Sequence, residues 1–137
     1  MRLSKTTEYA LRILGFMINS DKSLFSAGYI SEKLDMPDKY IRRIMTELSK
    51  NGFITSKQGR EGGYVFTQNA ENITLWEIVD AVEGIENYTK CILGFEECNE
   101  ENPCVLHDIF APVKEKMLDF LSTNTLADLK NEKIVKF

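Results

Sequence analysis

A tight turn between two short helical patterns constrains the fold of this chain more than any other feature. Residues 35–37, Asp-Met-Pro, separate a pattern that Ser26 can cap from a second pattern that runs to about Lys50. The apolar residues of the second pattern recur at the spacing of a buried helical stripe, and they are Ile41, Ile44, Met45 and Leu48. Two short helices joined by so few residues are typical of a helix-turn-helix.

A glycine-rich hairpin is predicted directly after this helix pair. Residues 53–57 and 64–67 are strand candidates, and residues 58–63 between them contain three glycines. Glycine adopts the backbone conformations that tight turns require, so the segment can form a projecting hairpin. Together with the two helices, this hairpin predicts a winged helix-turn-helix, in a chain that is mainly α.

Helical patterns are also predicted on both sides of this unit. One pattern covers residues 7–19. Thr74 and Glu77 have the spacing of a capping box, which predicts a helix over 75–83 that Gly84 stops. The sequence therefore predicts a winged helix-turn-helix DNA-binding domain over residues 1–84.

The second half of the chain begins without a sustained period. Residues 85–104 are predicted to be a functional loop. A helical stripe returns at Val105, and we expect Pro112 to kink or restart it. Thr125 and Asp128 can open a last short helix, so residues 105–137 are predicted to be helical.

Charge is distributed unevenly along the chain, which has a net charge of −4. Residues 1–67 carry a net charge of +4 and the remainder carries −8. The positive half suits phosphate binding, although such charges also serve simply to solvate a helix face. The candidate DNA contacts are Lys39, Tyr40, Arg42 and Arg43 on the second helix of the pair, and Lys57, Gln58 and Arg60 on the hairpin.

The chain shows no signal for a membrane. Its apolar runs are all shorter than the roughly 20 residues that span a bilayer. The first residues lead directly into a helical pattern and do not resemble a signal peptide. We therefore expect a cytoplasmic protein without a membrane partner.

Three cysteines lie within 14 residues, and their spacing is Cys91-x6-Cys98-x5-Cys104-x2-His107. An odd number of clustered cysteines argues against a disulfide framework and favours metal or redox chemistry. His107 is the only histidine in the chain and can share one face with Cys104. Zinc held by three cysteines and a histidine is a rival, although zinc sites usually have shorter gaps. Three buried thiols without a ligand are a further alternative.

Two other classes of function remain open on these residues. One is a metal-free or zinc-stabilised DNA-binding dimer that senses a small molecule. The other is a small redox enzyme with a reactive cysteine, which the sequence disfavours because it lacks Cys-x-x-Cys and has a single histidine for acid–base work. We therefore predict that the protein is not an enzyme.

The chain resembles the Rrf family of bacterial transcription regulators over nearly its whole length. The resemblance is carried by the opening residues 1–4 and 7–12, by Gly62-Gly63-Tyr64, by the three-cysteine loop and by residues 125–129. It implies a homodimer that binds a double-stranded operator, with the long helix after Cys104 as the dimerisation helix. The residues that match this role are Leu106, Ile109, Phe110, Val113, Met117 and Phe120.

The resemblance also implies an iron–sulfur cluster that is held by Cys91, Cys98 and Cys104 and controls operator binding. Family members of the IscR type complete a 2Fe–2S site with a histidine, and His107 stands at that position. Nitric-oxide sensors of the NsrR type complete a 4Fe–4S site with a carboxylate from the partner subunit, and Glu8 stands at that position. Both candidates are present, and His107 favours the 2Fe–2S form. The cluster would sense iron–sulfur status, redox state or nitric oxide.

Overall fold

The computed structural model describes residues 2–67 and 69–131. Its first helix, α1 (Lys5–Asn19), begins two residues earlier than the apolar pattern predicts. The cause is a cap, because the Ser4 hydroxyl accepts a hydrogen bond from the backbone N–H of Thr7 at 3.1 Å. A capping serine adds a first turn that carries no apolar residue, so periodicity alone does not detect it.

The predicted helix-turn-helix is present as α2 (Ala27–Leu34) and α3 (Asp38–Lys50). The Ser26 hydroxyl caps α2 by accepting a hydrogen bond from the Tyr29 N–H at 3.1 Å. Asp35 ends α2 in the left-handed conformation, with φ of 50°. Pro37 directly precedes α3, and its ψ of 128° is extended and not helical.

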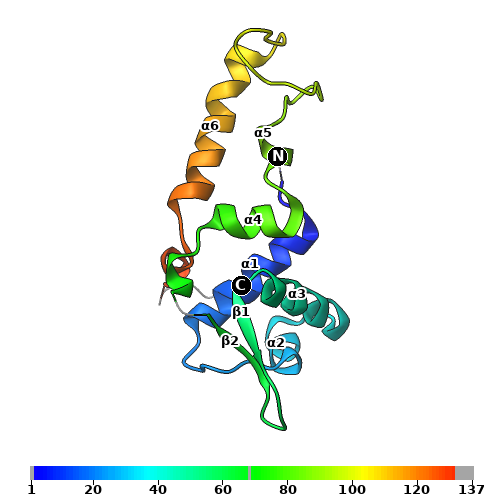
Figure 1. The fold of residues 1–137 in the computed structure, drawn as a ribbon, viewed down its shortest axis with the longest axis vertical. Coiled ribbons are helices and arrows are strands. Elements are labelled where there is room, and N and C mark those ends of the chain that lie inside the picture. Colours follow the sequence, from blue (N-terminus) through cyan, green and yellow to red (C-terminus); the bar gives the residue numbers. More distant parts are fainter. Residues whose placement is uncertain (1, 68, 132–137) are drawn as a thin grey trace.

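The hairpin consists of β1 (Ile54–Lys57) and β2 (Gly63–Phe66), which pair antiparallel with Ile54 opposite Phe66. It projects beyond the helices (Figure 1). Phe25 and Tyr64 tie it to the segment before α2 by two backbone hydrogen bonds of 2.9 and 2.7 Å. A Cβ at Gly63 would lie 2.6 Å from the Phe25 carbonyl oxygen, so this approach requires glycine.

After the hairpin, a short 3-10 turn, η1 (Ala70–Asn72), leads to α4 (Leu75–Glu83). The predicted capping box of Thr74 and Glu77 is present, and Gly84 ends the helix with a φ of 84°. The next element, α5 (Glu86–Thr89), lies in the segment that was predicted to be a loop. A helix of one turn is too short to produce a periodic pattern, so the sequence does not reveal it.

The last long helix, α6 (His107–Thr123), begins at His107 and not at Val105. It runs through Pro112 without a restart, so the expectation of a restart at this residue is wrong. Pro112 lies in the second turn and removes only the hydrogen bond to the Asp108 carbonyl. The predicted final helix is a 3-10 helix, η2 (Leu126–Leu129), and residues 132–137 lie outside the described residues.

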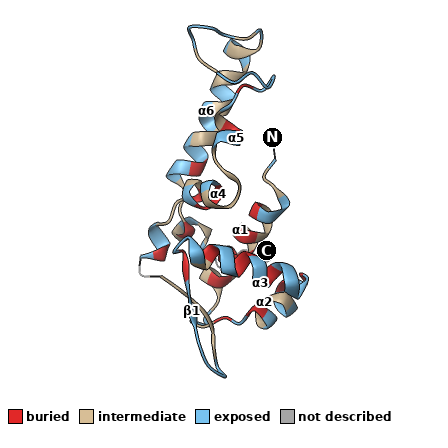
Figure 2. Cartoon of the chain, turned by 45° about the vertical axis from the view of Figure 1, so that its right-hand side comes forward, coloured by how far each residue is buried: buried red, intermediate tan, exposed pale blue. Residues whose placement is uncertain are grey.

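The hydrophobic core lies in the lower half of the molecule, around α1 (Figure 2). Ala10, Ile13 and Leu14 of α1 are fully buried, and α2, α3 and α4 pack around them. The segment after α6 joins this core, because Leu126 is fully buried and the Leu75 N–H donates to the Asn124 carbonyl at 2.9 Å. The base of α6 is therefore fixed to the start of α4.

The loop between α5 and α6 lies at the opposite end of the molecule from the hairpin (Figure 1). Most of this loop is exposed (Figure 2). It is flanked by α5 and α6, which lie side by side. None of the helices among the described residues is long and apolar enough to span a bilayer.

Candidate functional site

A groove of about 540 Å³ lies between the hairpin, the first turn of α2 and one side of α3. It brings together Arg42, Lys57 and Gln58, three of the residues predicted to contact DNA. The residues that share this lining are Ser26, Ala27, Gly28, Thr46, Gly59, Gly62, Gly63 and Tyr64. The groove therefore combines two basic side chains with hydroxyl groups and glycine backbone, a surface that a phosphate chain can approach closely.

Arg42 is positioned along the hairpin side of α3. Its Nε donates to Asp38 Oδ2 at 2.6 Å, and its carbonyl oxygen accepts from the Thr46 hydroxyl at 2.8 Å. Both charged side chains are exposed, so this ion pair contributes little to stability and can be exchanged for a phosphate. Thr46 was not predicted, although its position one turn after Arg42 is a signal for it.

The other predicted contacts are exposed but do not line this groove. Lys39 is exposed on α3 and Arg60 on the hairpin turn. Tyr40 is 54% exposed, and its ring meets that of Tyr9 edge-on, with centroids 6.4 Å apart. Arg43 borders a separate hollow that Thr6, Ile44, Glu47 and Val82 also line. Arg43 thus lies on the side of α3 that borders α1 and α4, and not in the hairpin groove.

The four candidate ligands of the loop form two pairs. Cys91 Sγ and Cys104 Sγ are 3.4 Å apart, and Cys98 Sγ lies 3.8 Å from His107 Nδ1. All three cysteines are free thiols. Cys91 and Cys98 belong to the loop side, and Cys104 and His107 lie at or just before the start of α6. Each pair is therefore a contact between the loop and the start of that helix.

Cys91 is the most buried of the three cysteines and has a distinctive environment. Hydrogen bonding from the Leu93 backbone, with further contributions from Cys104, Phe95 and Gly94, holds the pKa of the Cys91 thiol below its usual value, although burial opposes the shift. Gly94 in this segment is left-handed, with φ of 83°, and its N–H donates to the Cys91 carbonyl at 2.9 Å. This environment favours the thiolate, the form that binds metals.

The donor set consists of two separate pairs of side chains, and each pair is spaced as two ligands of one metal ion would be. Two thiolates on one tetrahedral ion at about 2.3 Å lie about 3.8 Å apart, which is close to the separation within each pair. Among the described residues, no three histidine, cysteine or acidic side chains converge to hold a single ion. A 2Fe–2S centre has two protein ligands on each iron, so two separate pairs suit it.

Glu8 is engaged elsewhere in this protomer. Its carboxylate forms ion pairs with Arg2 at 2.8 Å and with Lys5 at 3.2 Å. The hydrogen bond from Arg2, and then that from Lys5, lowers the pKa of Glu8. Glu8 therefore stays charged, and in this chain it lies in the first turn of α1 and not in the cysteine loop.

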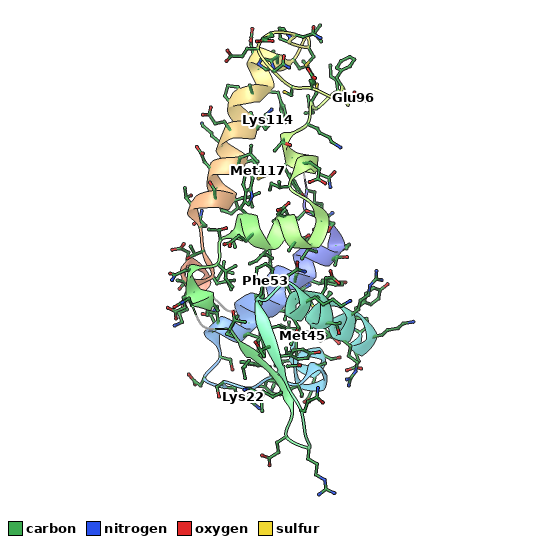
Figure 3. The ribbon with its side chains drawn as sticks, in the orientation of Figure 1. Lys22, Met45, Phe53, Glu96, Lys114 and Met117 are labelled. Atoms are coloured by element: carbon green, nitrogen blue, oxygen red, sulfur yellow. The ribbon has the colours of Figure 1, made fainter. Side chains whose placement is uncertain are left out.

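The segment that leads into Cys91 is fixed on both sides by residues that the sequence did not single out. Tyr88 donates to Glu83 Oε1, and the Ser4 N–H donates to Glu83 Oε2 at 2.9 Å. Lys114 of α6, labelled in Figure 3, donates to the Thr89 carbonyl at 3.1 Å. The loop is thereby linked through α5 to both α1 and α6.

One side of α6 carries an exposed apolar stripe. Val105 precedes the helix and is 88% exposed, and Ile109, Val113 and Phe120 follow at helical spacing with 74%, 55% and 51% exposure. The other predicted dimerisation residues, Leu106, Phe110 and Met117, are half-buried. Contiguous exposed apolar side chains of this kind mark contact surfaces.

Comparison with known proteins agrees with this architecture. Residues 3–132 match the family Rrf2, described as iron-dependent transcriptional regulator. The HTH-type transcriptional regulator IscR of Pectobacterium atrosepticum is 30% identical over 136 residues, which are 98% of this chain and 82% of that protein.

Solved structures show the same fold. The global cysteine regulator CymR of B. subtilis has a TM-score of 0.78 at 21% identity and covers 94% of this chain and 95% of its own. IscR of T. potens has a TM-score of 0.72 at 22% identity, over 94% and 85% of the two chains. The predicted winged helix-turn-helix fold is therefore confirmed. The chain belongs to the Rrf2 family and is a DNA-binding transcription regulator, not an enzyme.

Proposed function

We propose that this regulator is a homodimer whose binding to a double-stranded operator is controlled by an iron–sulfur cluster. The observation that carries the proposal is the arrangement of four donors in two pairs, Cys91 with Cys104 and Cys98 with His107. Each pair would hold one iron of a 2Fe–2S cluster. When bound, such a cluster changes its charge or composition on oxidation, nitrosylation or loss of iron.

The name IscR among the relatives supports an iron–sulfur role, and the family description supports iron dependence. His107 is the fourth ligand that we favour, because it lies beside Cys98 in the same protomer. Glu8 would instead complete a 4Fe–4S site if a partner subunit brought it to the loop. Its two ion pairs would then have to be exchanged for a bond to iron.

The dimer would form along α6. Its exposed stripe offers Val105, Ile109, Val113 and Phe120 to the same stripe of a second copy, which is the arrangement expected of a twofold interface. In each protomer the hairpin groove, which lies at the opposite end from the cysteine loop, would then contact DNA. The two DNA-binding domains of such a dimer must fit half-sites about 34–36 Å apart, or a multiple of this distance.

The cluster ligands are placed to influence that spacing. Cys104 and His107 stand at the entry of α6, and Cys91 continues from α5, which Glu83 joins to α1. Ligands that share a cluster would hold α5 and α6 in one relative position. Release of these ligands would let the two helices move. The two DNA-binding domains of the dimer would then no longer match the spacing of the half-sites.

Iron and sulfide counting on anaerobically purified full-length protein, with an absorption spectrum, tests the cofactor. We expect about two irons and two sulfides per protomer for a 2Fe–2S cluster, with visible absorbance. Stoichiometric zinc in a colourless protein would contradict the proposal and support the zinc-stabilised alternative. Protein without any metal that still binds its operator would point to a small-molecule sensor.

A further inference from the structure

Cys91 and Cys104 present two thiols within reach of each other. Their Sγ atoms are 3.4 Å apart, and a disulfide holds such atoms at about 2.05 Å. Cys98 has a different neighbour, because its sulfur faces His107 Nδ1 at 3.8 Å. Three cysteines allow three alternative disulfides, of which one can form at a time. These contacts favour the one between Cys91 and Cys104.

The surroundings allow the small movement that bond formation requires. Residues 92–97 are all exposed, and neither cysteine lies inside a helix. The hydrogen bonds of the intervening segment are local, such as Gly94 N–H to the Cys91 carbonyl and Asn102 N–H to Asn99 Oδ1. The two sulfurs can therefore approach by adjusting the loop, and no core residue has to move.

We propose that, in the metal-free protein, hydrogen peroxide converts Cys91 and Cys104 of one protomer into a reversible disulfide that withholds both thiols from the metal. The disulfide itself requires only these two side chains. Its consequence for metal uptake rests on the proposed function, because the same pair would hold one iron of the cluster.

The chemistry balances with one peroxide per disulfide. Hydrogen peroxide reaches the Cys104 sulfur first, because this residue is more exposed than Cys91. The Cys104 thiolate attacks one peroxide oxygen, the O–O bond breaks, and with the proton that the thiol released, sulfenic acid and water form. The Cys91 thiolate then attacks the Cys104 sulfur, the S–O bond breaks, and hydroxide leaves as a second water. Two thiols are oxidised, one peroxide is reduced to two waters, and a thiol reductant reverses the bond.

Peptide mapping of metal-free, full-length protein tests this assignment. After one equivalent of hydrogen peroxide and alkylation, we expect two of the three thiols to be lost and Cys98 to remain alkylated. Trypsin leaves all three cysteines in one peptide, but cleavage after glutamate separates them, because Glu96, Glu97, Glu100 and Glu101 lie between. A cross-link from Cys91 to Cys104 is the expected product. A disulfide through Cys98, a disulfide between protomers, or three unchanged thiols would overturn the proposal.

Two matched variants test which cysteines form the disulfide. C98S should form the same disulfide, whereas C91S should stop at a sulfenic acid that a dimedone probe traps. The wild-type map decides the assignment even if a variant fails to fold.

Metal uptake is measured separately. Oxidised protein should gain no visible absorbance with ferrous iron and sulfide until dithiothreitol is added, and equal uptake by oxidised and reduced protein would contradict this consequence. If reduced protein also gains no visible absorbance, the proposed function is wrong. The peptide map still tests the disulfide independently of that result.

Discussion

The Tyr88 hydroxyl donates a hydrogen bond to Glu83 Oε1 at 2.5 Å, and Tyr88 is three residues before the first cysteine. The other oxygen of Glu83 accepts a hydrogen bond from the Ser4 N–H. One carboxylate thus joins the start of α1 to the end of α4 and to α5. The contact is a direct link between the domain that contains the groove and the segment that presents Cys91.

Replacing Tyr88 with phenylalanine removes this link and retains the ring. Because hydrogen bonds to charged groups are worth about 1.5–3 kcal/mol and this one is only part-buried, we expect Y88F to lower the free energy of unfolding by about 1–2 kcal/mol at pH 7. Urea denaturation measures the loss. Y40F, at an exposed ring, is the control and should change stability by less than about 0.5 kcal/mol.

The same residue predicts a pH dependence in the alkaline range. Burial, followed by the hydrogen bond to Glu83, raises the pKa of Tyr88 from 10.0 to about 12. A raised pKa in the folded state means that the stabilisation is complete below pH 10 and is lost as the pH rises through 12. The stability difference between wild type and Y88F should therefore shrink over this interval. A difference that stays constant to pH 12 would exclude the proposed proton linkage.

The groove predicts how DNA binding depends on salt. Each phosphate contact by a basic side chain contributes about 0.9 to the slope of log affinity against log salt concentration. We expect R42A to reduce this slope by about 0.9 per protomer, measured by fluorescence anisotropy with operator DNA. K130A, whose side chain pairs with Glu71 and does not line the groove, should leave the slope unchanged. An equal slope for R42A and wild type would remove Arg42 from the interface.

The apolar stripe of α6 predicts the oligomeric state. A glutamate at Ile109 or Val113 would place a charge in the centre of the proposed interface, at a high desolvation cost. We expect I109E and V113E to elute as monomers in size-exclusion chromatography with light scattering. The exposed Glu115 is two residues from Val113 and faces another direction, so E115K should remain dimeric. Dimeric I109E and V113E would exclude this surface.

The two candidate fourth ligands can be separated by substitution. If His107 completes the site, H107A should lose most of its bound iron and sulfide, whereas E8A should retain them. E8A also breaks the ion pairs with Arg2 and Lys5, so its folding should be checked by circular dichroism. Cluster loss in a folded E8A protein, with H107A intact, would assign the role to the partner's carboxylate.

Sequence patterns predicted most of the DNA-binding domain. Apolar periodicity located α3, the Thr74–Glu77 spacing located the start of α4, and the glycines located the hairpin. These features are local, and each follows from side chains that are close in the sequence. Pro112 was misjudged, because its effect depends on how near it lies to the beginning of α6.

The features that remained hidden depend on contacts between distant residues. Glu83 meets Ser4 across 79 positions, and Lys114 meets Thr89 across 25, so no spacing rule finds them. The pairing of the cysteines was also open, since spacing does not say which sulfur faces which. The sequence and its resemblance identified the candidate ligands, and the structure arranged them in two pairs.

The most direct test of the account compares operator binding by the same dimer with and without its cluster. Anaerobic protein should be divided, one portion stripped of iron by a chelator under reducing conditions, and both titrated with operator DNA across several salt concentrations. We expect the affinities of the two portions to differ at least about tenfold, a coupling free energy of about 1.4 kcal/mol, and reconstitution to restore the original value. Equal affinities for the two portions at every salt concentration would contradict it.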